Sequence, residues 1–239
     1  MNFARTLRDW RYRCFYGLLL SRRHTLVSMG NPTTGCGWTF HPGGLGPASV
    51  VYSGGVGNDI SFEHALVERF GCQVVLFDPS PTGTATMAKP ENQLPQFRYF
   101  PVGLAGREGH LTLAPPLNPE EGSWFMHGGS ARTIQVPCTD LGSLMHRSGH
   151  THVDLLKLDI EGTEYEVLDD LLKSRIPVRQ ICVEFHHGML PGIRRSQSIR
   201  AMLRLLARGY QLLSQDGNNH TFLRRDAWAE PKPLIANAT

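Results

Sequence analysis

The chain has 239 residues, of which 41% are hydrophobic and 19% are charged, so a sizeable core can form and global disorder is not expected. The net charge of +3 is unevenly placed: residues 1–25 hold six arginines and one aspartate, which gives +5 and leaves −2 for the rest. The main body therefore lacks the positive charge of a nucleic-acid-binding domain, and no nucleic-acid partner is expected.

The N-terminal 25 residues predict a basic amphipathic helix with Leu7, Trp10, Cys14 and Leu18 on one face. Such a helix packs on its own domain or on a partner, which we favour, or lies on an anionic membrane surface. The apolar run "CFYGLLL" is too short to span a membrane, and no small-residue cleavage site follows it.

The five cysteines are scattered without a Cys-x-x-Cys pair, so we expect reduced thiols in a cytoplasmic protein and no structural zinc site. The sequence indicates no oligomeric state.

Three regions are expected along the chain. Residues 1–47 should comprise the N-terminal helix and a loop rich in Gly and Pro, in which Trp38 and Phe40 are the expected anchors. Residues 48–230 should form one α/β domain, and residues 231–239 a loose tail.

From residue 48 onwards, strand and helix patterns alternate. Strands are predicted over 48–53, 72–78, 96–104, 153–160 and 178–185, and helices over 59–71, 139–149, 163–174 and 194–209. Two further hairpins are predicted: one over 110–116 and 131–137 outside the main sheet, and a terminal one over 210–225 around "DGNN". This order predicts a mostly parallel sheet covered by helices on both faces, with an antiparallel last strand.

The first two strands end in motifs typical of nucleotide binding. Ligands of open α/β sheets bind beyond the carboxyl ends of the strands. The first strand is followed by "YSGGVGND", whose glycines at 54, 55 and 57 allow a ligand to approach the backbone, although neither GxGxxG nor a Walker loop is present. The second strand ends in Asp78, where an acid can hold ribose hydroxyls. A plain tight turn and a turn-initiating Asp before Pro79 are the structural alternatives, but the combination favours nucleotide-type binding.

The stretch "DLLKLDIEGTEYEVL", residues 154–168, places charged side chains where an apolar strand meets a helix. Alternation puts Lys157 and Asp159 on the same face of the strand, so a buried Lys157 would need a carboxylate partner. Glu164 falls in the first turn of the next helix, where an acid suits the helix dipole. Asp159 and Glu161 have no such structural explanation.

The next strand ends in "VEFHHG", in which Glu184 and His186 share one side. In neighbouring parallel strands these two side chains should meet Asp159 and Glu161. Carboxylates and an imidazole in one crevice suit general-base chemistry. They also suit a divalent metal, an alternative that the sequence leaves open but does not favour.

Together these motifs resemble the FkbM family of S-adenosylmethionine-dependent methyltransferases, whose hallmark is a strand ending in Lys-x-Asp-x-Glu-Gly-x-Glu. The segments "VVYSGGVGNDISFE" and "VLFDPSP" are similar to the methyltransferase-like 24 branch of that family, and the resemblance covers residues 37–224. It implies a class I methyltransferase (Rossmann-like) fold with a seven-stranded sheet, and S-adenosylmethionine as the methyl donor. One departure from the general pattern is Tyr52, which stands where many class I methyltransferases carry an acid. The methyltransferase-like 24 branch shares this lack, and Asn58 or Asp59 would then supply the polar contact.

The resemblance also implies roles for individual residues. The donor-binding set is Ser53, Gly54, Gly55, Gly57, Asn58, Asp59, Asp78, Pro79, Val102 and Gly103. Asp159, Glu161 and His186 would face the methyl group and its acceptor, with Asp159 or His186 as the base for O-methylation of a small-molecule, sugar or peptide acceptor. Residues 106–139 and 26–47 would cover the site. The alternatives are a non-catalytic module that binds S-adenosylmethionine or a partner, and an NAD-dependent oxidoreductase, which the absence of GxGxxG disfavours.

Overall fold

The computed structural model describes residues 14–116, 122–126 and 132–225. Its main element is a seven-stranded sheet with the order β12-β13-β11-β10-β3-β4-β5. The strands are β3 (Val50–Gly54), β4 (Gln73–Phe77), β5 (Phe97–Phe100), β10 (Val153–Leu158), β11 (Val178–Glu184), β12 (Tyr210–Asp216) and β13 (Asn219–Arg224). Only β13 runs antiparallel, inserted between β11 and β12. The predicted class I methyltransferase architecture with an antiparallel last strand is therefore confirmed.

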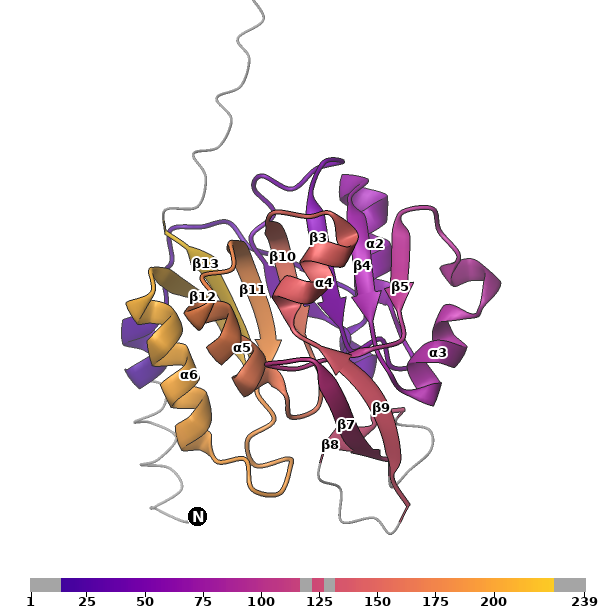
Figure 1. Cartoon of the computed structure of the whole chain (residues 1–239). Coiled ribbons are helices and arrows are strands. Elements are labelled where there is room, and N and C mark those ends of the chain that lie inside the picture. The colour runs from indigo at the N-terminus through magenta and orange to yellow at the C-terminus, as the bar shows by residue number, and fades with distance from the viewer. Residues whose placement is uncertain (1–13, 117–121, 127–131, 226–239) are drawn as a thin grey trace, which may run out of the picture.

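Helices cover both faces of this sheet (Figure 1). On one face lie α4 (Leu141–Ser148), α5 (Glu164–Lys173) and α6 (Arg195–Ala207), and on the other lies α2 (Ser61–Phe70). The side chains of β10 alternate between two cores: Leu156 and Leu158 pack with α4, α5 and α6, whereas Leu155 packs with α2. Two short helices, α3 (Pro81–Met87) and η2 (Pro90–Asn92), follow β4.

A smaller sheet lies at the carboxyl ends of the parallel strands (Figure 1). It has the order β6-β9-β7-β8, formed by β6 (Gly103–Leu104), β7 (Gly109–Ala114), β8 (Phe125–Met126) and β9 (Ile134–Thr139). The predicted hairpin outside the main sheet is thus confirmed as β7 and β9. The prediction of one strand over 96–104 was wrong: the chain leaves the main sheet after β5 at Pro101, which has no N–H to donate to a ladder, and β6 joins the smaller sheet.

The segment 26–47 is more ordered than the predicted loop. It contains a two-stranded antiparallel sheet of β1 (Val27–Met29) and β2 (Trp38–Phe40), with the short helix η1 (Pro32–Thr34) between them. Strands of three residues are too short to show a period in the sequence. The predicted anchors are confirmed, because Trp38 and Phe40 are buried in the core beside Phe62 of α2.

Of the N-terminal helix, residues 14–19 are described and helical. The predicted apolar face was wrong for this part: Cys14 is exposed and Leu18 is 87% exposed, whereas Tyr16 is buried in the core. The run "CFYGLLL" is apolar on every side, so periodicity cannot select a face. Leu7, Trp10 and the predicted tail lie outside the described residues. No helix among the described residues is long and apolar enough to cross a bilayer.

Candidate active site

A cavity of about 850 Å³ opens beyond the carboxyl ends of β3, β4, β10 and β11. The glycine-rich loop after β3 forms one wall, and the ends of β10 and β11 form another. Both segments expected to cover the site reach it: residues 33–36 line it from one side and residues 122–124 from the small-sheet side. Trp124 is held there by a hydrogen bond from its Nε1 to Thr82 Oγ1 of 3.1 Å.

The loop after β3 is held in place by Asp78, the residue that follows β4. One carboxylate oxygen of Asp78 accepts hydrogen bonds of 3.0 Å from the backbone N–H groups of Val56 and Gly57. The other accepts one of 2.8 Å from Ser80 N. A carboxylate offers about four acceptor positions, so Asp78 can accept one further hydrogen bond from a ligand.

The structure separates the predicted donor-binding residues into two groups. The cavity-lining group is Gly55, Gly57, Asn58, Asp59, Asp78, Pro79 and Gly103. Ser53, Gly54 and Val102 are not among the lining residues. Ser53 is buried and donates its hydroxyl to Glu63 of α2, a buried acid that the sequence did not single out. Asp59 accepts hydrogen bonds of 2.6 Å from Thr34 Oγ1 and Ser61 N, so it joins the segment 26–47 to the start of α2.

Tyr52 does not line the cavity. Its ring is buried and its hydroxyl lies 2.9 Å from His150 Nδ1. The side chain at this departure from the pattern of many class I methyltransferases therefore packs in the core beneath α4.

Lys157 has the carboxylate partner that its burial requires. Its Nζ lies 3.7 Å from Asp159 Oδ2 and donates a hydrogen bond of 2.6 Å to the carbonyl oxygen of Gly55. Burial alone would lower the pKa of Lys157, but the carboxylates of Asp159 and Glu63 outweigh it and raise that pKa. A buried ammonium group thus ties the end of β10 to the glycine-rich loop.

Glu164 starts α5 as predicted, but its side chain does more than suit the helix dipole. It is fully buried and accepts hydrogen bonds from the backbone N–H groups of Ile160 and Gly162. Its Oε1 also lies 2.8 Å from His186 Nδ1. Glu164 therefore orders the turn after β10 and orients the His186 ring at once.

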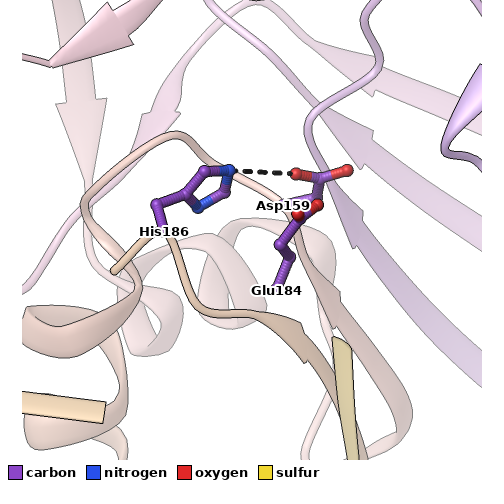
Figure 2. Close-up of side chains that lie close together, drawn as sticks. All are labelled: Asp159, Glu184 and His186. Atoms are coloured by element: carbon purple, nitrogen blue, oxygen red, sulfur yellow. Dashed lines mark ion pairs between the residues drawn. The ribbon is translucent and has the colours of Figure 1, made fainter. Parts of the chain in front are cut away.

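His186 is 1% exposed and sits among carboxylates. Its Nε2 lies 3.1 Å from Glu161 Oε2. The same nitrogen lies 3.7 Å from Asp159 Oδ1 (Figure 2). Burial alone would lower the pKa of His186, but Glu161 and Glu164 outweigh it and raise that pKa to about 12. The neighbouring carboxylates thus favour the protonated form of the ring.

Asp159, Glu184 and His186 converge at the cavity edge (Figure 2), and one ligand atom from each lies within 4.8 Å of the others. The predicted meeting of the two strand ends is thus confirmed. Glu184 was noticed in the strand pattern but left out of the predicted catalytic set. Burial, followed by the neighbouring Asp159 carboxylate, raises the pKa of Glu184 to about 7.

Known proteins resemble this chain over most of its described length. Residues 55–212 match the family model described as "Methyltransferase FkbM domain". Over 167 residues the chain is 26% identical to the Homo sapiens protein "Probable methyltransferase-like protein 24" and 25% identical to the Rattus norvegicus protein of the same description. Each alignment covers 69% of this chain but only 39% of the relative. Among solved structures, the Methanococcus jannaschii fibrillarin pre-rRNA processing protein aligns with 85% of this chain and 84% of its own, at 9% identity and a TM-score of 0.41.

Proposed function

Because this chain belongs to the methyltransferase FkbM domain family, we propose that it transfers a methyl group from S-adenosylmethionine to an oxygen of its acceptor. One observation carries the proposal: the glycine-rich loop and the carboxylate group of Asp159, Glu161 and Glu184 line the same cavity. A donor held by the loop would therefore have its acceptor beside groups that can take a proton.

The residues on the loop side fit the donor. Asp78 keeps one acceptor position for a ribose hydroxyl. A Cβ added at Gly57 would meet no protein atom within 4 Å, so the backbone there leaves space for a ligand. Gly103, Leu104 and Leu111 supply an apolar wall suited to the adenine.

S-adenosylmethionine supplies a methyl group that is displaced from its sulfonium sulfur, which keeps the electron pair of the broken S–C bond. The acceptor oxygen forms the new O–C bond and gives up its proton. The carboxylates at the ends of β10 and β11 are the groups placed to receive that proton. The side chains of Asp159 and Glu161 are 21% and 16% exposed, so an acceptor in the cavity can reach them. His186 is held by Glu164 and Glu161, and we assign it a positioning role.

Methyl transfer to oxygen requires an acceptor that has a hydroxyl group able to lose its proton. We propose a small molecule, a sugar or a peptide side chain, because the cavity volume of about 850 Å³ is in the range of small-molecule sites. No nucleic-acid acceptor is proposed, since residues 26–239 carry a net charge of −2.

The test has two stages. Calorimetry with S-adenosylmethionine, S-adenosylhomocysteine and NAD should show binding of both sulfur ligands and none of NAD. Asp78→Asn should weaken donor binding by about tenfold, corresponding to about 1.4 kcal/mol, whereas exposed Asp216→Asn should not change it. Failure of both sulfur ligands to bind would refute the proposal.

The second stage uses labelled donor with extracts and mass spectrometry. The expected product is heavier by one CH₂ unit and carries the label on oxygen. Donor binding without any labelled product would favour the alternative of a non-catalytic binding module, and a label on nitrogen would refute the oxygen assignment.

A further inference from the structure

We propose that Asp159, Glu184 and His186 bind a divalent cation at the edge of the cavity. Two carboxylates and one imidazole are a mixed oxygen and nitrogen ligand set, which suits ions such as Mn²⁺ or Zn²⁺. The existence of this site does not depend on the proposed methyl transfer; only the role of the bound ion does.

The strand register brings the ligands together. β10 and β11 are parallel neighbours in which Leu158 pairs with Val183, so Asp159 and Glu184 follow side by side at the sheet edge. His186 comes two residues later on the same side. One ligand atom from each lies within 4.8 Å of the others. Ligands about 2.0–2.2 Å from one ion lie up to about 4.4 Å apart, so modest side-chain rotations would complete the site.

An independent observation is the way His186 is held. Histidines that bind metals commonly donate their other ring nitrogen to a carboxylate, which fixes the ring and directs the free nitrogen at the ion. Here Glu164, itself fully buried, lies 2.8 Å from Nδ1 as an ion-pair contact outside hydrogen-bond geometry, and Nε2 faces Asp159 and Glu161. The ring is 1% exposed, so water cannot take the place of these carboxylates as partners of the ring nitrogens.

The charge around the ring also calls for a cation. Asp159, Glu161, Glu164 and Glu184 bring four carboxyl groups around the ring, and Lys157 supplies one ammonium group, 3.7 Å from Asp159. Glu161 Oε2 is buried and has no hydrogen-bond partner among the described residues, although it lies 3.1 Å from the His186 ring. Carboxyl groups gathered in a buried site are costly to ionise without a compensating cation, and a divalent ion would supply that positive charge.

The backbone at Glu161 is consistent with a built site. Glu161 has φ of 53°, in the left-handed region that non-glycine residues seldom adopt. Such strain is retained where the surroundings enforce it, often at functional sites. This conformation keeps the Glu161 carboxylate beside the proposed ion.

An ion held by Asp159, Glu184 and His186, which line the cavity, would supply Lewis acidity to an acceptor hydroxyl bound there. A metal-bound oxygen loses its proton more easily than a free one, and the adjacent Glu161 carboxylate would receive that proton. This role deepens the proposed O-methylation and rests on it.

The site is tested directly by titrating the chelator-treated full chain with Mn²⁺ and following free Mn²⁺ by electron paramagnetic resonance. One Mn²⁺ per chain is expected, displaced by excess Zn²⁺. Asp159→Asn and Glu184→Gln should each weaken binding at least about tenfold. Glu91→Gln is the matched control, because Glu91 lines the same cavity outside the cluster, and it should bind as the wild type does.

Thermal unfolding shows whether each variant is folded. If Asp159→Asn does not fold, Glu184→Gln alone carries the test. Absence of Mn²⁺ binding by the wild type, or binding that survives Glu184→Gln, would overturn the proposal. The titration contains neither donor nor acceptor, so its failure is distinct from a failure of methyl transfer.

Discussion

At the scale of single residues, Glu164 shows how one side chain can serve several groups. Its carboxylate accepts hydrogen bonds from the turn at Ile160 and Gly162 and contacts the His186 ring, all without solvent exposure. Removing such a group leaves the two backbone donors unpaired in a low-dielectric interior and takes away one of the carboxylates beside His186. Glu164 should therefore matter for stability beyond the helix start it provides.

We expect Glu164→Ala to lower the free energy of unfolding by about 3–5 kcal/mol, because it removes a carboxylate from the buried His186 ring and leaves two backbone N–H groups without their acceptor. Glu164→Gln keeps an oxygen acceptor for the two N–H groups, so it should cost only about 1–3 kcal/mol. Urea denaturation of both variants measures the difference. Equal losses would show that the charge of Glu164 contributes nothing.

At the scale of elements, the loop from β3 to α2 depends on a close approach to the end of β10. Gly55 has φ of +82°, and a Cβ there would collide with the backbone carbonyl oxygen of Asp159. Asp159 N donates back to Gly54 O at 3.2 Å. The glycine thus joins the glycine-rich wall of the cavity to the end of β10.

Gly55→Ala should lower the free energy of unfolding by about 2–5 kcal/mol, through left-handed strain and overpacking together. Gly209→Ala is the control: its φ is +90°, but no atom lies within 4 Å of the added Cβ. It should therefore show only the conformational cost of about 1–2 kcal/mol. Thermal unfolding compares the two, and a Gly55 variant as stable as the Gly209 variant would contradict the predicted collision.

Strand β13 carries a histidine into the core. Burial lowers the pKa of His220 to about 4, against a hydrogen bond to the Asn218 carbonyl that raises it. Its Nε2 lies 2.9 Å from the Tyr16 hydroxyl of the N-terminal helix. The neutral ring is therefore the folded form.

The pKa of His220 is about 6.5 in the unfolded chain and about 4 in the folded chain. The unfolded state therefore binds the proton more tightly, so the contribution of neutral His220 to the free energy of unfolding is complete above about pH 6.5 and is lost as the pH falls towards 4. The shift corresponds to about 3 kcal/mol. When the pH falls from about 6.5 to about 4, the free energy of unfolding should drop less in His220→Gln than in the wild type. The variant His110→Gln, at an exposed position, should show the same drop as the wild type. Urea denaturation at several pH values measures this, and parallel curves for all three proteins would contradict the assignment.

At the scale of the whole molecule, the cavity is assembled from segments far apart in the chain: residues 33–36, the loop after β3, the small sheet and the ends of β10 and β11. A ligand that contacts all of these binds only the folded state. S-adenosylhomocysteine at a hundredfold excess over its Kd should stabilise the protein by about 2.7 kcal/mol. In thermal unfolding, the Tm should rise by about 2–4 °C for each kcal/mol of this stabilisation. NAD, as the control, should leave the Tm unchanged. Equal Tm values with and without S-adenosylhomocysteine would refute donor binding.

Much of the architecture could be predicted from the chain because alternation, helix caps and turn residues are local properties. The strands β3, β4, β10 and β11, the Asp140 cap of α4 and the terminal hairpin all follow from neighbouring residues. The meeting of Asp159 with Glu184 and His186 was also predictable, because parallel strands place their carboxyl ends at one edge.

Tertiary structure decided the partners of side chains, since these depend on elements that are distant in sequence. Local patterns could not show that Glu164 turns back onto His186, that Asp78 binds the loop after β3, or that Thr34 reaches Asp59. Nor could they select the buried face of the N-terminal helix, whose apolar run has no polar side. The charges between β10 and α5 were thus visible in the sequence, but their contacts with one another and with Glu184 and His186 arose only when β10, β11 and α5 packed together.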